Sequence, residues 1–231
     1  MEAIILAGGF GTRLQHIMSD LPKPMAPMNE QGTPFLSLLL DRLYMAHFSR
    51  VVLSTGYMKE KIGAYFGTRY RGMEILYAEE DTPLLTGGAI KKALESCEED
   101  AVFTLNGDTY FEVDFADMQK VLRSRNADIV MAVKEMKNFD RYGTVMIENG
   151  RVLDFEEKKY CRSGWINGGI YCIRRDLLNG AKRKFSFEKY LEKEVGHLNI
   201  VTYSSEGFFI DIGVPQDYLY AQQCYKEGLL R

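Results

Sequence analysis

The stretch Leu6-Ala-Gly-Gly-Phe-Gly-Thr-Arg-Leu14 follows the apolar run Met1-Glu-Ala-Ile-Ile-Leu6 and precedes Pro22-Lys-Pro-Met25. The apolar run has the composition of a buried strand. Glycines at positions 8, 9 and 11 allow the chain to turn tightly and bring its N–H groups against a ligand. Converging N–H groups bind anions, and Arg13 and Lys23 add positive charge beside them. The sequence therefore predicts a strand that opens into a nucleotide-binding loop.

Two better-known phosphate loops do not fit this stretch. A P-loop requires G-x-x-x-x-G-K-[ST], and no Gly-Lys-Ser/Thr follows here. The dinucleotide fingerprint requires a third glycine where Leu14 stands. A dinucleotide-dependent oxidoreductase is therefore a disfavoured alternative.

Composition limits the class of protein further. The chain has 231 residues, 46% of them hydrophobic and 26% charged, as expected for a soluble globular protein with a substantial core. A net charge of −3 gives no electrostatic footprint for nucleic acid. No apolar run is long enough for a membrane span, and the first residues lack the features of a signal peptide. The four cysteines lie far apart with no C-x-x-C pair, which argues against zinc and predicts a cytoplasmic location.

The chain alternates strands and helices in its first half and is richer in strand in its second. We expect strands at 1–6, 50–55, 74–78 and 101–106, and helices at 35–48, 58–66 and 88–96. This alternation predicts a Rossmann-like, doubly wound α/β sheet with ligands at the carboxyl ends of its strands. Closely spaced strands follow at 128–133, 143–147, 151–155 and 168–173, with an Asn149-Gly150 hairpin turn, then helices near 185–195 and 215–227.

The loop resembles the signature of the sugar-1-phosphate nucleotidyltransferases, G-G-x-G-T-R-L-x-P-x-T-x-x-x-P-K-P, with His16 for the first proline and Met18 for the threonine. The resemblance implies a GT-A-like mixed sheet in one domain over 1–231. About 1–125 would bind nucleotide and about 126–231 sugar phosphate. It also implies catalytic roles for Arg13 and Lys23. Nucleotide would be bound by Leu6, Ala7, Gly8, Gly9, Gly11, Thr12, Arg13 and Lys23.

Two aspartates are candidate ligands for Mg²⁺. Gly107-Asp108 ends a predicted strand, although Asp-Thr is also a common turn. Mg²⁺ takes one or two protein carboxylates and completes its octahedron with phosphate and water. The run from Phe208 to Tyr218 resembles the family's F-x-D-I-G-T-P-x-D-Y, with Val214 for the threonine. Carried over, Asp108 and Asp211 hold the metal, and Asp108 also acts in catalysis and nucleotide binding.

The second half contains three elements that resemble sugar-phosphate motifs. Tyr142-Gly143 resembles the family's Y-G, and Glu156-Glu157-Lys158 its E-K-P, although the latter run alone would be read as a solvated strand end. Asn167-Gly168-Gly169-Ile-Tyr171 resembles N-x-G-x-Y. A glutamate would accept sugar hydroxyls, the lysine would neutralise the phosphate, Asn167 would donate and accept, and the glycines would leave room for ligand. The implied sugar-phosphate set is Gly107, Gly143, Glu157, Lys158, Asn167 and Gly168.

Residues 78–89 resemble the base-binding stretch P-L-G-T-A/G-G, with Leu85 in place of its glycine. Glu80 falls where relatives that use thymidine or uridine nucleotides tend to carry glutamine. An ionised glutamate only accepts hydrogen bonds, and guanine alone presents adjacent N1–H and N2–H₂ donors. Glu80 therefore favours GTP, the alternative being an exposed acidic turn. Thr86 and Gly87 complete the nucleotide-binding set.

The implied reaction is transfer of a nucleotidyl group from an NTP to a sugar 1-phosphate. The run Ser19-Asp-Leu-Pro-Lys-Pro-Met-Ala-Pro27 most resembles the short guanylyltransferases that act on D-glycero-α-D-manno-heptose 1-phosphate. Mannose 1-phosphate is the nearest competing substrate, followed by glucose 1-phosphate with a pyrimidine nucleotide. The product would be an activated sugar for capsule or other surface glycans such as lipopolysaccharide.

Two further expectations concern the alternatives and the partners. A regulatory nucleotide-sugar sensor is the non-catalytic alternative, and it predicts loss of Arg13, Lys23, Asp108 or Asp211, all of which are present. The expected partners are GTP and a sugar 1-phosphate, with no nucleic acid and no membrane. A homodimer is expected only from the frequency of twofold oligomers.

Overall fold

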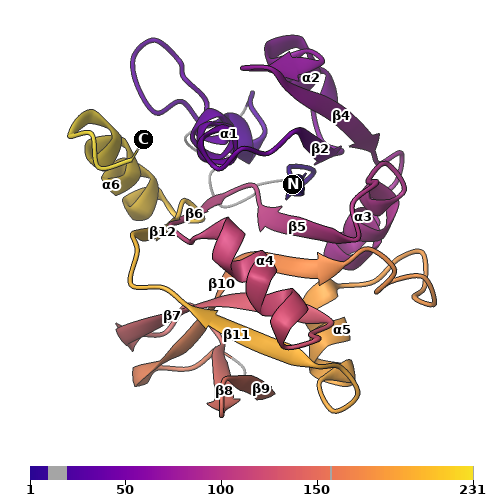
Figure 1. The fold of residues 1–231 in the computed structure, drawn as a ribbon. Coiled ribbons are helices and arrows are strands. Elements are labelled where there is room, and N and C mark those ends of the chain that lie inside the picture. Colours follow the sequence, from indigo (N-terminus) through magenta and orange to yellow (C-terminus); the bar gives the residue numbers. More distant parts are fainter. Residues whose placement is uncertain (10–19, 157, 231) are drawn as a thin grey trace.

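A computed structural model describes residues 1–9, 20–156 and 158–230 of the chain. These residues form a mixed ten-stranded sheet of order β3-β4-β2-β1-β5-β10-β7-β11-β9-β8, with helices on both sides (Figure 1). A second, two-stranded sheet joins β6 (Thr109–Phe111) to β12 (Phe209–Asp211). The prediction of a mixed α/β sheet is confirmed.

The first half builds the parallel part of the sheet. Its elements are β1 (Glu2–Leu6), α1 (Phe35–Met45), β2 (Arg50–Thr55), α2 (Lys59–Phe66), β4 (Met73–Glu79), α3 (Leu85–Leu94) and β5 (Ala101–Asn106), with the short edge strand β3 (Arg69–Tyr70) beside β4. The chain moves outward from β1 to β2 and β4, and then returns to place β5 on the other side of β1. The strand order therefore reverses between β1 and β5, where open α/β sheets bind ligands beyond the strands' carboxyl ends.

The second half extends the same sheet with mostly antiparallel strands. Its elements are α4 (Phe115–Ser124), β7 (Ile129–Phe139), β8 (Thr144–Glu148), β9 (Arg151–Glu156), β10 (Cys161–Arg174), α5 (Phe187–Glu194), β11 (Ile200–Ser204) and α6 (Pro215–Lys226). β10 pairs antiparallel with both β5 and β7, so it joins the two halves. In the β8–β9 turn, Asn149 and Gly150 have φ values of 51° and 73°, as the predicted Asn-Gly hairpin requires.

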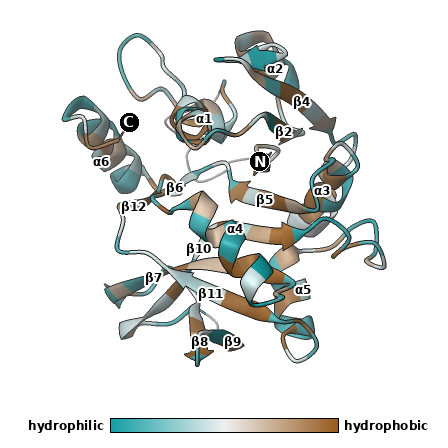
Figure 2. Ribbon diagram, in the orientation of Figure 1, coloured by the Kyte–Doolittle hydropathy of each residue, from teal (hydrophilic) through white to brown (hydrophobic). Residues whose placement is uncertain are grey.

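Both faces of the sheet are buried. On one face, side chains such as Ala3 and Ile5 pack with apolar residues of α1, α2, α4 and α6. On the other, Ile4 packs with residues of α3 and α5, including Ile90 and Leu191. Figure 2 shows hydrophobic residues along the central strands and hydrophilic ones on the outer loops. This explains why the parallel strands read as continuous apolar runs. Within the described part of the chain, no helix is long and apolar enough to cross a membrane.

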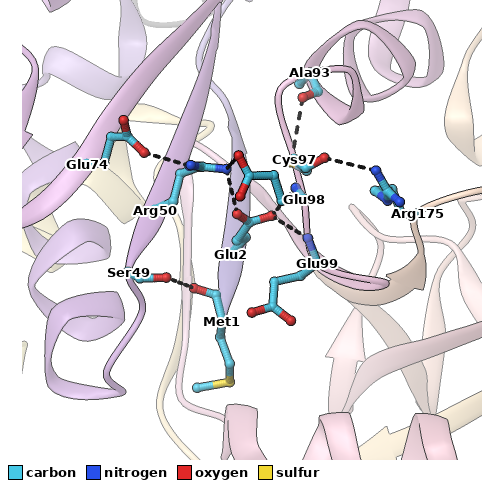
Figure 3. Close-up of polar contacts among 10 residues, drawn as sticks. All are labelled: Met1, Glu2, Ser49, Arg50, Glu74, Ala93, Cys97, Glu98, Glu99 and Arg175. Atoms are coloured by element: carbon cyan, nitrogen blue, oxygen red, sulfur yellow. Dashed lines mark hydrogen bonds and ion pairs between the residues drawn. The ribbon is translucent and has the colours of Figure 1, made fainter.

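An ionic network centred on the buried Glu2 ties the amino ends of the parallel strands together (Figure 3). The side chain of Glu2 is only 5% exposed. Its Oε1 accepts from Arg50 Nη1 at 2.9 Å, and its Oε2 accepts from the backbone N–H groups of Glu98 and Glu99 at 2.7 and 3.0 Å. Arg50 also pairs with Glu74 at 2.6 Å and with Glu98 at 3.0 Å. The network fixes the starts of β1, β2 and β4 against the loop before β5, at the end of the sheet away from the strands' carboxyl ends.

Candidate active site

The candidate site begins where β1 and β5 end. The N–H of Gly107 donates to the carbonyl of Leu6 at 3.0 Å. A Cβ atom on residue 107 would lie 2.4 Å from that carbonyl oxygen, so only glycine permits this approach. The contact places Asp108, the next residue, beside the start of the loop that follows β1.

Asp108, Asp211 and Lys23 meet at this point. Asp211 is the last residue of β12 and lies opposite Thr109 of β6, and Ile212 N donates to the carbonyl oxygen of Asp108 at 3.0 Å. Lys23 lies in the 3₁₀ turn η2 (Lys23–Met25). Its Nζ is 2.5 Å from Asp108 Oδ2 and 3.7 Å from Asp211 Oδ1. Antiparallel pairing of two short strands thus brings two distant carboxylates onto one ammonium group.

The two carboxylates fit a divalent cation. Their side chains are 34% and 29% exposed, and both face the same positive charge. Carboxylate oxygens are the donors that Mg²⁺ prefers. In residues 1–9, 20–156 and 158–230 there is no group of three or more His, Cys, Asp or Glu side chains that could hold a metal. Asp108 and Asp211 would therefore hold an ion whose other ligands are phosphate oxygens and water.

A polar cavity of about 550 Å³ opens beside this cluster. It combines residues from the carboxyl ends of β1 and β5 with residues from α3, α5 and the segment after β9. Its lining residues are Leu6, Gly9, Lys23, Pro24, Thr86, Asn106, Gly107, Asp108, Lys158, Glu188 and Gly213. The structure thus gathers Leu6, Gly9, Lys23, Thr86, Gly107, Asp108 and Lys158, all predicted from the sequence, around one space.

A larger cavity of about 1300 Å³ lies between α1 and α4 and has a different character. Its lining includes Arg42 and Tyr110, and none of the predicted site residues. The Arg42 guanidinium donates to the carbonyls of Phe111 and Val113, and it lies 4.9 Å from the centre of the Tyr110 ring. Through these contacts Arg42 stabilises the segment from β6 to α4.

Glu80 lies against the loop that follows β1, as a base-reading residue would. A Cβ atom on Gly8 would lie 3.0 Å from Glu80 Oε1 and 3.2 Å from Gly56 N, so three strand ends meet closely here. Glu80 Oε1 accepts from Ser54 Oγ at 3.4 Å, and Oε2 accepts from Leu84 N at 2.7 Å. Each carboxylate oxygen has two acceptor sites, so Glu80 can order the turn before α3 and still accept from a ligand. Glu80 is half-buried, unlike the exposed Glu79 beside it.

The start of α3 shows how Leu85 replaces the family's glycine. Leu85 has φ = 64°, in the left-handed region that glycine adopts freely and a bulky residue adopts at a cost. The backbone conformation expected of a glycine is therefore present.

Packing accounts for the presence of a glycine at position 87. The N–H groups of Gly87 and Gly88 both donate to the carbonyl of Phe185, at 3.0 and 3.2 Å. A Cβ atom on Gly87 would lie 2.2 Å from the Phe185 ring. The segment before α5 therefore requires glycine here, and a nucleotide contact for Gly87 stays a prediction.

On the sugar side, the reason expected for the glycines of β10 is wrong. The space beside Gly168 is filled by the Phe111 ring, which a Cβ atom would approach to 2.5 Å, and Asn106 fills the space beside Gly169. Asn167 Oδ1 accepts from Gly169 N at 3.0 Å, and Asn167 Nδ2 donates to Tyr171 Oη at 2.5 Å. These contacts hold a bulge in β10, where Gly169 has φ = 73°.

Tyr142 lies near Asp211, and Gly143 follows it in the chain. A Cβ atom on Gly143 would lie 2.7 Å from the carbonyl oxygen of Glu156, so glycine lets these backbones approach closely. Burial, supported by the negative charge of Asp211, raises the pKa of the Tyr142 phenol to about 12. Tyr142 therefore faces the carboxylate as a neutral phenol at physiological pH.

Several predicted residues remain without structural description, and one residue of the pocket was not predicted. Gly11, Thr12, Arg13 and Glu157 lie outside the described residues. Ala7 is buried, and its N–H donates to the carbonyl of Ser54 at 2.8 Å, so it anchors the start of the loop to β2.

Glu188 lines the pocket although no motif identified it. The only signal was an acidic residue in the first turn of a helix, which is common because it complements the helix dipole.

Comparison with known proteins identifies relatives that match nearly the whole chain. A relative from Aneurinibacillus thermoaerophilus, named D-glycero-alpha-D-manno-heptose 1-phosphate guanylyltransferase, is 46% identical over 96% of this chain and 97% of its own. A protein of the same name from Campylobacter jejuni is 43% identical over 94% of this chain and 97% of its own.

Solved structures agree as well. The crystal structure of HddC from Yersinia pseudotuberculosis has a TM-score of 0.85 at 32% identity, over 97% of this chain and 99% of that one. HddC is also known in a complex with GMP-PN. The family profile described as nucleotidyl transferase matches residues 2–228. This chain therefore belongs to the nucleotidyl transferase family, as the resemblance of its glycine-rich loop predicted.

Proposed function

We propose that this enzyme transfers the guanylyl group of GTP to D-glycero-α-D-manno-heptose 1-phosphate, which gives GDP-heptose and pyrophosphate. The observation that carries the proposal is that Lys23 meets both Asp108 and Asp211, and that Lys23 and Asp108 line a polar pocket together with Lys158. Such a pocket suits two phosphorylated ligands, because it offers two ammonium groups and a pair of metal-binding carboxylates. The choice of heptose is supported by the relatives that are 46% and 43% identical over nearly their full lengths.

The chemistry requires alignment and charge neutralisation and no general base. A phosphate oxygen of the sugar 1-phosphate attacks the α-phosphorus of GTP in line. The new P–O bond forms as the bond to the bridging oxygen breaks, and pyrophosphate leaves. Because the nucleophile is already an anion, the enzyme accelerates the step by holding both phosphates and offsetting their charge.

The residues of the pocket divide these tasks. Asp108 and Asp211 would hold Mg²⁺, whose charge offsets that of the phosphates when it is bound. The Lys23 ammonium group, now paired with the two carboxylates, can exchange a carboxylate oxygen for an oxygen of the α-phosphate. Lys158 would bind the attacking phosphate. Arg13 and the N–H groups of the loop that includes Gly8 and Gly9 would bind the β- and γ-phosphates.

The base would be read at the corner formed by Gly8 and Glu80. The carboxylate of Glu80 is held in place by Ser54 and by the N–H of Leu84, so it is oriented before the nucleotide arrives. An oriented acceptor pair matches the N1–H and N2–H₂ donors of guanine and has no match in adenine or in the pyrimidines. The division into a nucleotide half and a sugar-phosphate half, the homodimer, the cytoplasmic location and the use of the product in surface glycans all stay predictions of the sequence.

The proposal is tested by pyrophosphate release from GTP and heptose 1-phosphate in the presence of Mg²⁺, with the product identified by its mass. We expect turnover by the wild type and a loss of about 10²-fold or more in Asp108→Asn, as for loss of a charge that stabilises the transition state. Asp100→Asn is the matched control. Asp108 follows the carboxyl end of β5, whereas Asp100 directly precedes the amino end of β5 and is fully exposed. Equal rates in the two variants would contradict the assignment of the site.

A further inference from the structure

Two carboxylates line the pocket among the described residues, Asp108 and Glu188, and Glu188 belongs neither to the predicted metal pair nor to the base-reading corner. It lies in the first turn of α5, next to the N-cap Ser186. It shares the pocket lining with Asp108 and Lys158. It is therefore within reach of the ligands of this pocket and is so far without a role.

One oxygen of this carboxylate is held by two hydroxyl groups. Glu188 Oε2 accepts from Thr86 Oγ1 at 2.7 Å and from Ser186 Oγ at 2.6 Å. Both hydroxyl oxygens are themselves fixed by the backbone, since Phe187 N donates to Thr86 Oγ1 at 2.8 Å and Lys189 N to Ser186 Oγ at 3.3 Å. Among the described residues no group donates to Glu188 Oε1. The carboxylate is thus oriented, with one acceptor oxygen available.

The surroundings of Glu188 place it where the two halves of the site meet. Thr86 belongs to α3 and lies within the stretch 78–89 that resembles the family's base-binding segment. Phe187, which is 1% exposed, packs its ring 5.1 Å from that of Tyr171 in β10. Tyr171 carries the hydrogen bond from Asn167, a predicted sugar-binding residue. Burial and the nearby charge of Glu188 both raise the pKa of Tyr171, which agrees with this proximity.

The charge of Glu188 decides which part of a ligand it can face. A carboxylate only accepts hydrogen bonds and repels phosphate, whereas Lys158 in the same pocket attracts it. Glu188 must therefore face a neutral part of the ligand that is rich in hydroxyl donors. The hydroxyl groups of a sugar meet that requirement.

We propose that Glu188 accepts a hydrogen bond from a hydroxyl group of the sugar 1-phosphate and so contributes to the choice of sugar. This inference rests on the proposed function, because it assumes that a sugar 1-phosphate occupies the pocket. It assigns Glu188 to substrate binding, and it leaves the transfer step to the groups around the α-phosphate.

The test compares Glu188→Gln with Glu192→Gln, an exposed glutamate one turn further along the same helix. KM for heptose 1-phosphate, KM for GTP, kcat and Tm are measured for both variants and the wild type. We expect KM for the sugar 1-phosphate to rise about 10-fold in Glu188→Gln, as for a lost hydrogen bond to a charged group. KM for GTP and Tm should change little, and Glu192→Gln should behave as the wild type.

Monodeoxy analogues of the sugar 1-phosphate then identify the hydroxyl. The wild type should lose affinity for one analogue, and Glu188→Gln should not distinguish that analogue from the parent sugar. An unchanged sugar KM in Glu188→Gln would overturn the inference. So would an equal rise of both KM values together with a lower Tm, which is the pattern of a residue that only joins α3 to α5.

A failure of the proposed function is distinguishable from a failure of this inference. If the wild type prefers another sugar 1-phosphate, the proposed substrate is wrong. The same comparison of Glu188→Gln and Glu192→Gln is then made with the sugar that the enzyme uses.

Discussion

Replacing Lys23 with methionine should make the protein bind divalent cations more tightly while it makes the enzyme slower. Lys23 Nζ lies 2.5 Å from Asp108 Oδ2 and 3.7 Å from Asp211 Oδ1, so a cation that enters between the carboxylates competes with this ammonium group. Removing the ammonium leaves two negative groups with less compensation. A metal ion then no longer competes with the Lys23 ammonium group for the two carboxylates.

The size of the effect follows from the exposure of the groups. The two aspartate side chains are 34% and 29% exposed, so solvent weakens each ion pair to about 0.5–1 kcal/mol. Two such pairs amount to about 1–2 kcal/mol, or about 5- to 30-fold in Kd for the metal. The kcat of the same variant should fall about 10²- to 10³-fold, because the lysine also stabilises charge at the α-phosphate.

Titration with Mn²⁺ followed by electron paramagnetic resonance measures the first effect directly, without nucleotide or turnover. Lys23→Arg keeps the positive charge and should bind Mn²⁺ about as the wild type does. Lys120→Met, at an exposed position of α4, controls for the loss of one surface charge. Mn²⁺ binding to Lys23→Met that is equal to or weaker than that of the wild type would refute the competition between lysine and metal.

Three other predictions concern stability. Arg50→Met should lower the free energy of unfolding by about 3 kcal/mol, because it leaves the buried carboxylate of Glu2 without its cation. Urea unfolding measures this loss, and a loss below about 1 kcal/mol would contradict the prediction. At position 85, where φ is 64°, glycine should be more stable than alanine by about 0.5–1 kcal/mol, the reverse of the order in a regular helix, and thermal unfolding of Leu85→Gly and Leu85→Ala decides the sign. The pKa of Tyr142 is raised from 10.0 to about 12 in the folded state. The stability that the neutral phenol contributes is therefore fully present below the ordinary tyrosine pKa, and it is lost as the pH rises from that value through the pKa of the folded state. The wild type should therefore lose about 1 kcal/mol more than Tyr142→Phe between pH 9.5 and 11, and parallel curves would contradict the prediction.

Elements that carry their own signal were predictable from the sequence. Strands 50–55 and 101–106 were placed with their observed bounds, because each is an apolar run ended by a polar residue and a glycine. β7 and β10 run further than predicted, since their outer parts are largely polar and pair with each other, and β10 also pairs with β8. α4 was missed, although Asp114 caps it by accepting from Asp117 N.

The candidate site, like the fold, was predictable from the sequence only in part. The roles proposed for Asp108 and Asp211 follow from the family resemblance, but their meeting depends on the pairing of β6 with β12. Each of these strands has three residues, too few for a hydrophobic period to show. Glu188 could not be found from the sequence, because its place in the pocket depends on the packing of α5 over α3 and on the hydroxyl of Thr86.

Gly168 shows a limit of a different kind. The sequence predicted that Gly168 leaves room for a ligand, but the Phe111 ring fills that space, and Phe111 comes from a strand that was not predicted. A motif can therefore locate a residue while tertiary packing decides what the residue does there.

The measurement that tests the central claim most directly is a competition in one vessel. The wild-type enzyme, Mg²⁺ and pyrophosphatase are mixed with equal concentrations of GTP, ATP, UTP, CTP and dTTP and of the heptose, mannose and glucose 1-phosphates. The nucleotide sugars formed are then separated by chromatography against standards, because the mannose and glucose products have equal masses, and are identified by mass. We expect GDP-heptose as the dominant early product. A dominant product with another base would contradict the role of Glu80, and a dominant GDP-mannose or GDP-glucose would contradict the proposed sugar.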